Sequence, residues 1–339
     1  MTTDHRYKYI KYKKKYLNLR GGLEDLKTIT SIIITHNGRL RCMLDKLFPG
    51  TIDDLLKKYN SAHPDKKPVD EIRFKNGCIL KCKLKYDIKC TISLQMVYSG
   101  TVTKRKEGLY FKSPNDSANK LTVDTNATED TDTDTDIVFP EIKRQMNPAF
   151  CFGKTTLTEI DHEIYIIRHG EASHNVSSVN FKKDTILTNQ GIIDTKRTGE
   201  ELSLLLNLTK NDKIYYFASD LKRTRQTLSI INEQLKKNPK LNLPKEIIVA
   251  PCSKELSYTH TGDCDAKNYK FIPFENRHVC SSSQTQCVSN CLDVNTNDLC
   301  CCAKGGLKIN WDYYNEFHNK KLHCRFTSLV QEIIKIIHQ

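Results

Sequence analysis

The sequence predicts an α/β protein built around a mostly parallel sheet. Apolar, β-branched runs of strand length alternate with segments of helical periodicity, and this alternation is typical of βαβ units. Polar residues directly follow several of these runs, where open α/β proteins build their ligand sites. The chain has 339 residues, of which 38% are apolar, so it can hold one large domain or two ordinary ones together with sizeable solvated segments.

Two regions of the chain carry this alternation. In the second half we expect strands at 163–171 (running into a polar loop), 212–220 and 245–252, and helices at 188–207, 221–237 and 311–339. In the first half we expect a strand at 27–35, helices at 39–48 and 51–60, and hairpin strands at 71–86 and 90–100, with Asn76-Gly77 as a turn signal.

Composition divides the chain further. Residues 1–27 form a basic tail rich in Tyr and Lys. Residues 113–138 are acidic and poor in apolar side chains, so we expect a disordered linker between one part at 28–112 and another at 139–339. The stretch 259–306 is rich in Cys, Ser and Asn and interrupts the alternation, which predicts an inserted loop or cap.

The formal net charge of +13 suits a polyanionic partner or a phosphorylated substrate. Residues 1–20 hold seven basic residues against one acidic residue, interleaved with four tyrosines. Such a mixture can bind single-stranded nucleic acid weakly, although a solvated, frayed tail is the simpler interpretation. The segment YKYIKYKKKYLNLRGG also resembles the N-terminal tails of some giant DNA-virus proteins.

No apolar run approaches the ~20 residues that span a bilayer, and the N-terminus lacks the apolar core of a signal peptide. We therefore expect no membrane association and a cytoplasmic location, in the host cytoplasm or the virion if the protein is viral. In that compartment the fourteen cysteines are expected to be reduced thiols or metal ligands. Two pairs have zinc-like spacing, without a clean second pair after either: Cys78 with Cys82, and Cys287 with Cys291.

The strongest local signal is Arg168-His169-Gly170, which lies at the tip of an apolar strand. An imidazole there faces substrate, and the adjacent guanidinium supplies fixed donors for phosphate oxygens. Gly170 lets backbone N–H groups approach an anion closely. The alternative interpretation is a surface Arg-His pair that ends a strand.

The residues that follow resemble the histidine phosphatase superfamily, also called phosphoglycerate mutase-like, in the family's own order over ~90 residues. The R-H-G-E-x-x-x-N signature is matched by Arg168, His169, Gly170, Glu171 and Asn175. The segment SDLKRTRQT matches S-x-L-x-R-A-x-Q-T, which places the second phosphate-binding arginine at Arg223 rather than at Arg225. The segment KELSY resembles the piece that carries the proton-donor carboxylate, which places that role at Glu255.

The resemblance implies a three-layer α/β/α fold and a phosphoryl-transfer site that needs no metal or other cofactor. His169, neutral near pH 7, would attack phosphorus and carry a phosphohistidine. Arg168 and Arg223 would bind the phosphoryl oxygens, with Asn175 also in the phosphate site. Glu255 would protonate the leaving oxygen.

One element of the family is missing from its usual place. Members end with a strand leading to a second catalytic histidine, in a segment like V-S-H-G-G-x-I-R-x-L-L, whereas this chain stops after its final helical pattern. The segment SIIITHNGRLRCML resembles that piece and supplies His36, with Asn37 where Gly is usual. We therefore expect a circular permutation, in which 28–112 is the family's C-terminal part and His36 and Asn37 complete the phosphate site beside His169. If the family's second histidine segment were present at its usual place, the simpler interpretation of His36 would be a strand-end histidine with no partner.

These observations predict a phosphomonoester hydrolase that acts on a phosphorylated small molecule or phosphoprotein. A phosphoglycerate-type mutase would use the same groups but return the phosphoryl group to its product. A third possibility is an inactive relative that binds nucleic acid or another partner through its basic tail.

Overall fold

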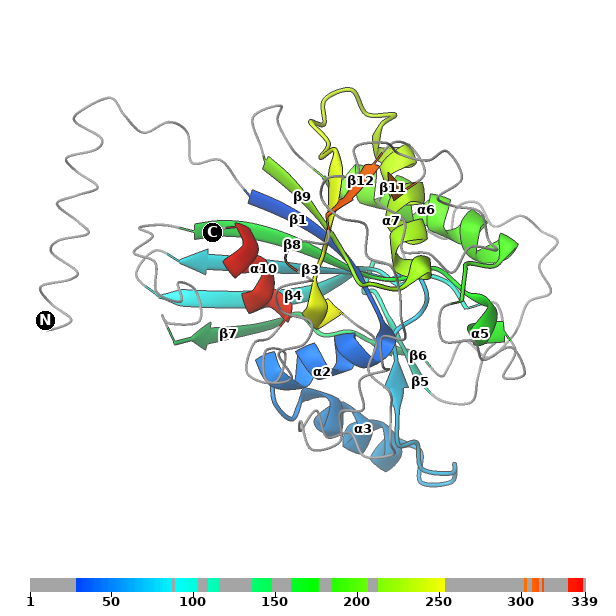
Figure 1. The fold of residues 1–339 in the computed structure, drawn as a ribbon. Coiled ribbons are helices and arrows are strands. Elements are labelled where there is room, and N and C mark those ends of the chain that lie inside the picture. The colour runs from blue at the N-terminus through cyan, green and yellow to red at the C-terminus, as the bar shows by residue number, and fades with distance from the viewer. Residues whose placement is uncertain are drawn as a thin grey trace, which may run out of the picture.

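The computed structural model describes residues 29–86, 89–102, 109–115, 136–147, 160–176, 185–206, 213–253, 302–303, 307–310, 313 and 329–337 (Figure 1). The predicted tail at 1–27 lies outside these ranges, as do residues 116–135 of the predicted linker and most of the Cys-rich stretch. Within them, no helix is long and apolar enough to cross a membrane.

The described strands form one large sheet of nine strands, in the order β11-β12-β10-β9-β1-β8-β3-β4-β7. From one edge to the other these strands are β11 (Cys302–Ala303), β12 (Leu307–Asn310), β10 (Glu246–Val249), β9 (Lys213–Ala218), β1 (Ile29–Thr35), β8 (Ile160–Arg168), β3 (Ile79–Tyr86), β4 (Cys90–Tyr98) and β7 (Ile142–Met146). The five adjacent strands from β12 to β8 are parallel, and antiparallel pairs occupy the two ends. Strands of 28–112 and strands of 139–339 therefore share a single sheet.

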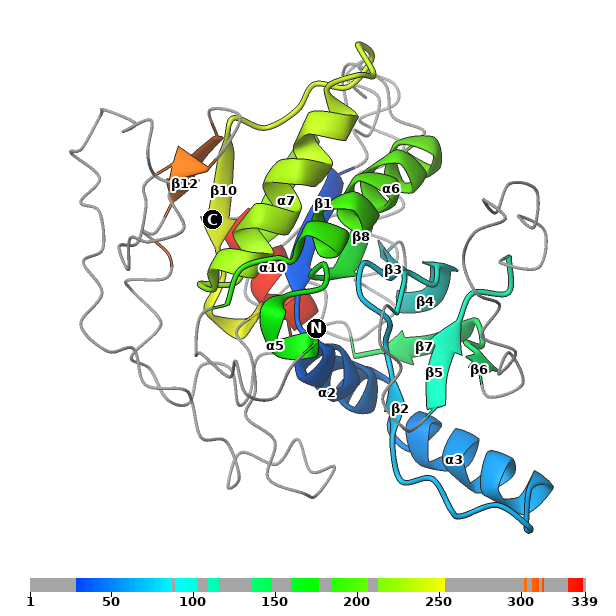
Figure 2. The same cartoon turned by 90° about the vertical axis from the view of Figure 1, so that its right-hand side faces the viewer.

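Helices cover both faces of the sheet, which gives the predicted three-layer α/β/α fold (Figure 2). Helices α6 (Asn189–Leu205) and α7 (Lys222–Leu235) pack on one face. Helices α2 (Asn37–Leu47) and α10 (Leu329–Ile337) pack on the other, and α3 (Thr51–Ala62) follows α2.

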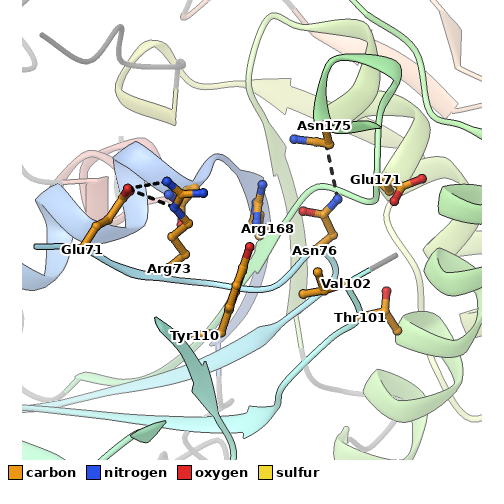
Figure 3. A pocket seen from close by; sticks show the side chains of 10 residues that line it. Glu71, Arg73, Asn76, Thr101, Val102, Tyr110, Arg168, Glu171 and Asn175 are labelled. Carbon is orange, nitrogen blue, oxygen red and sulfur yellow. Dashed lines mark hydrogen bonds and ion pairs between the residues drawn. The ribbon is translucent and has the colours of Figure 1, made fainter. Parts of the chain in front are cut away.

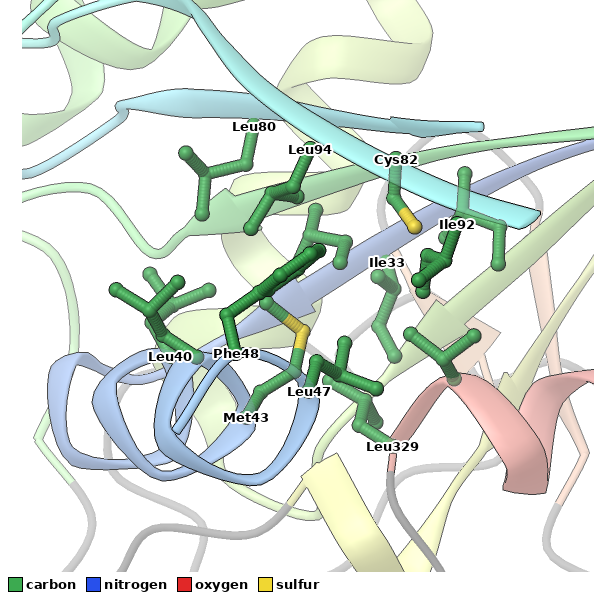
Figure 4. Close-up of a cluster of buried hydrophobic side chains, with 14 of the residues drawn as sticks. Ile33, Leu40, Met43, Leu47, Phe48, Leu80, Cys82, Ile92, Leu94 and Leu329 are labelled. Carbon is green, nitrogen blue, oxygen red and sulfur yellow. The ribbon is translucent and has the colours of Figure 1, made fainter. Parts of the chain in front are cut away.

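The central strands read as continuous apolar runs because both of their faces are buried. Along β1, Ile33 belongs to the core under α2 and α10 (Figure 4), whereas Ile32 and Ile34 belong to the core under α6 and α7. All three side chains are fully buried, and each such burial contributes about 1.5–3 kcal/mol to folding.

A second, small sheet stands beside the large one, in the order β2 (Ile72–Arg73), β5 (Leu109–Lys112), β6 (Asp136–Val138), with all strands parallel. It corrects two expectations. The hairpin is formed by β3 and β4, so Asn76-Gly77 is a corner between the two sheets instead of a hairpin turn. The last three residues of the predicted linker are strand β6, because Ile137 and Val138 pair with β5 and Asp136 forms an ion pair with Lys75 at 2.7 Å.

The cysteines were expected to be reduced thiols or metal ligands, and two of the described ones are neither. Cys90 and Cys252 are disulfide-bonded, whereas Cys42, Cys78 and Cys82 are buried thiols outside any disulfide. Burial raises the pKa of the Cys78 and Cys82 thiols to about 12. In the metal-free chain these two thiols are therefore protonated at neutral pH.

Candidate active site

The site forms where β1 and β8 end side by side. These strands are parallel and in register, with Thr35 beside Arg168, so the next residues, His36 and His169, leave the sheet at the same edge. The His169 backbone N–H donates to the Thr35 carbonyl at 3.0 Å. The chain after β1 enters α2 on one face, whereas the chain after β8 leads to α6 on the other. Connections that diverge in this way open a crevice at the carboxyl ends of the strands.

The rings of His36 and His169 lie together although 132 positions of the chain separate them. Their centroids are 5.1 Å apart at an angle of 62°, and the two residues are 0% and 1% exposed. Strands β1 and β8 thus bring the two rings together at one edge of the sheet.

The hydrogen bonds of His169 fix which of its ring nitrogens carries the proton. Nδ1 lies 2.7 Å from the Gly170 carbonyl, which can only accept, so Nδ1 carries the proton and Nε2 the lone pair. Burial lowers the pKa of His169 well below its usual value, and Arg223, His36, Arg168 and His174 lower it further. The imidazole is therefore neutral, as a nucleophile must be.

Arg223 joins the two histidines. It stands in the first turn of α7, and its Nε donates to His169 Nε2 at 3.3 Å while its Nη2 contacts His36 Nδ1 at 3.4 Å. Arg225 points elsewhere and contacts the Asp220 carbonyl at 3.4 Å. Of the two arginines, Arg223 is thus the one placed to contact a group that reaches His169.

The backbone after His169 has room only for glycine. A Cβ at Gly170 would lie 2.2 Å from Thr195 Oγ1 and 3.0 Å from the Gly191 carbonyl oxygen. The Gly170 N–H in turn donates to Thr227 Oγ1 of α7 at 3.0 Å. The glycine therefore lets α6 and α7 approach the strand end that carries His169.

A pocket of about 220 Å³ lies next to this cluster, and Arg168 is one of the residues that line it (Figure 3), whereas His36, His169 and Arg223 do not line it. Arg168 also donates to the Phe74 carbonyl. Asn37 and Asn175 line the pocket, and each also holds backbone: Asn37 Oδ1 accepts from Phe74 N–H and Asn175 Oδ1 from Ala172 N–H, both at 2.9 Å.

Two residues near the histidines had no role assigned from the sequence. Ser219 Oγ lies 2.8 Å from His36 Nε2 and fixes that ring, and its place in the S-x-L-x-R match was the available signal. The ring of His174 lies 5.8 Å from the His169 ring, and its Nδ1 is 2.6 Å from Thr185 Oγ1. Glu255, predicted as proton donor, lies outside the described residues.

Comparison with known proteins identifies one family. Residues 164–248 match the model of the histidine phosphatase superfamily (branch 1), a segment that contains Arg168, His169 and Arg223. No curated protein and no solved structure matches the chain.

Proposed function

Residues 164–248 of this chain belong to the histidine phosphatase superfamily, and from that premise we propose that the protein hydrolyses phosphomonoesters through a phosphohistidine on His169. The family supports a phosphatase- or mutase-type activity in general. The observation that carries the finer proposal is the buried contact of Arg223 with both His169 and His36.

In the first step, His169 Nε2 attacks phosphorus in line and forms a P–N bond while the P–O bond to the leaving group breaks. Arg168, Arg223 and His36 hold the phosphoryl oxygens, on which charge accumulates. Ser219 Oγ, 2.8 Å from His36 Nε2, holds the His36 ring in this position. Glu255 gives its proton to the leaving oxygen; this role rests on the family resemblance.

In the second step, Glu255 takes a proton from water, and the oxygen attacks phosphorus as the P–N bond breaks. Inorganic phosphate leaves, and His169 regains its lone pair. Arg223 Nε stands in front of His169 Nε2 in this structure, so its side chain has to yield that position to the phosphoryl group.

A circular permutation is part of the proposal. The matched family segment begins on β8, and β1 with His36 lies between β8 and β9 although it comes first in the chain. The adjacency of the two histidines supports residues 28–112 as the family's C-terminal part.

The proposal is tested by release of inorganic phosphate from p-nitrophenyl phosphate. We expect turnover by the wild type, its loss in His169→Ala, and unchanged turnover in His63→Gln, a histidine at the end of α3 that stacks on Tyr59. Turnover that is equal in wild type and His169→Ala would refute the mechanism. Phosphoryl transfer only with a bisphosphorylated primer would indicate a mutase, and no activity with any phosphomonoester would favour a binding protein.

A further inference from the structure

The pocket is polar, which bears on the leaving group of the substrate; we call the part lined by Arg73 and Tyr110 its outer end. Of the ten described residues that line the pocket, only Val102 is apolar (Figure 3). The others carry amide, hydroxyl, carboxylate or guanidinium groups. Such a wall favours a charged or hydroxylated leaving group over an aryl or alkyl one, because buried polar groups need partners.

Arg73, which lines the pocket, shares its carboxylate partner with a second arginine. Glu71 stands between two arginines: its Oε1 is 2.6 Å from Arg41 Nη1, and its Oε2 is 2.7 Å from Arg73 Nη2. The Arg41 side chain is 8% exposed and lies behind Glu71, whereas Arg73 lines the pocket. Glu71 is therefore shared between Arg41, which lies behind it, and Arg73, which lines the pocket, so the carboxylate does not pair with Arg73 alone.

The strand register aims the Arg73 side chain into the pocket. Arg73 of β2 is paired with Tyr110 of β5, so the two side chains share one face of the small sheet, and both line the pocket. Their neighbours Ile72 and Leu109, which form the preceding pair of the same register, are buried in the core. The small sheet thus anchors one face in the core and presents Arg73 with Tyr110 on the other.

We propose, on the basis of the proposed function, that Arg73 recognises a second anionic group on the leaving part of a small phosphorylated substrate, with Tyr110 as an additional hydrogen-bond donor. Arg168 and Arg73 line the same pocket, so one molecule can engage the catalytic phosphate site and the outer arginine together. A volume of about 220 Å³ suits a leaving group of a few carbons. The second anion is a carboxylate or a phosphate, both of which a guanidinium can bind through paired N–H groups.

The test uses three substrates that differ only at one end: three-carbon alkyl phosphates that terminate in a hydroxyl group, a carboxylate or a second phosphate. For the wild type we expect kcat/KM for the two anionic substrates to exceed that for the hydroxyl substrate by about 10- to 100-fold, the usual effect of a charge-assisted contact. The comparison of carboxylate with phosphate identifies which anion is preferred.

In Arg73→Gln we expect this ratio to fall to near one, whereas Arg73→Lys retains part of it because the charge remains. Arg197→Gln, which removes an exposed arginine of α6, should keep the wild-type ratio. Equal kcat/KM for all three substrates in the wild type, or an unchanged ratio in Arg73→Gln, would overturn the inference. In either case, turnover of p-nitrophenyl phosphate or of any of the three substrates that depends on His169 leaves the proposed function standing, whereas no turnover of any of these phosphomonoesters removes both.

Discussion

The inner and outer ends of the candidate site are built on different sheets and are held in different ways. The inner end is the cluster of His36, His169 and Arg223, which lies next to the pocket where strands of the large sheet end; these residues are between 0% and 3% exposed and do not themselves line the pocket. The outer end rests on the small sheet, where the Arg73 and Glu71 side chains are both 27% exposed. Groups buried in a packed sheet edge have little freedom to move, whereas an ion pair at this exposure is open to solvent and to a ligand.

This difference suggests a division of labour. The inner end supplies the nucleophile and its partners, which any phosphomonoester needs. The outer end supplies the contacts that distinguish one leaving group from another. Changes at the inner end should therefore affect all substrates alike, and changes at the outer end should alter their order.

The largest effect is expected for His169→Ala. Loss of the nucleophile should lower kcat by roughly 10³-fold or more, and by a similar factor for each of the three-carbon phosphates. Steady-state kinetics on all three substrates measure this. A loss of activity with only one of the three substrates would contradict the view that the inner end serves all substrates alike.

His36→Gln should lower kcat by about 10²- to 10³-fold, because it removes one donor to the developing charge on the phosphoryl group. KM and the substrate order should change much less. Steady-state kinetics of His36→Gln, compared with those of the control variant His63→Gln, measure both kcat and KM. If the two variants behave alike, then His36 does not belong to the inner end and the permuted arrangement loses its catalytic support.

The next largest effect is expected on stability, from a change in the packing behind His169. Gly170→Ala should lower the free energy of unfolding by about 1–3 kcal/mol, because its Cβ would lie 2.2 Å from Thr195 Oγ1. Denaturant unfolding measures the change. The double variant Gly170→Ala/Thr195→Ala should recover part of the loss, and additive losses would show that this contact is not the cause.

The smallest effect concerns pH and stability. Burial, assisted by Arg223 and the other neighbours, lowers the pKa of His169. The unfolded chain therefore takes up a proton on His169 as the pH falls through about 6.5, the folded chain does not, and the folded state is destabilised. Between pH 7 and pH 5 this costs at most about 2 kcal/mol.

Unfolding free energies of wild type and His169→Asn at the two pH values check the sign. The variant should lose less stability on acidification, whereas His63→Asn should follow the wild type. A larger loss in His169→Asn than in wild type would contradict a neutral, buried His169.

The central strands could be predicted from the sequence because burial on both faces leaves continuous apolar runs such as the one around Ile33. His36 could be placed beside His169 only through the order of the family's segments, since no local pattern links positions so far apart. Strand β2 could not be predicted as part of a separate sheet. It has two residues, too few for a periodic signal, and its partner β5 comes more than thirty residues later in the chain. The ion pairs of Glu71 with Arg41 and Arg73 follow from that placement, so they were missed as well.

The account depends most on phosphate becoming attached to His169. Wild-type protein mixed with a phosphomonoester, quenched rapidly at alkaline pH and analysed by peptide mass spectrometry, should carry one phosphoryl group on His169. The same group should form more slowly in His36→Gln and not at all in His169→Ala. A phosphoryl group on another residue, or turnover of the substrate without any phosphorylated protein, would contradict the account.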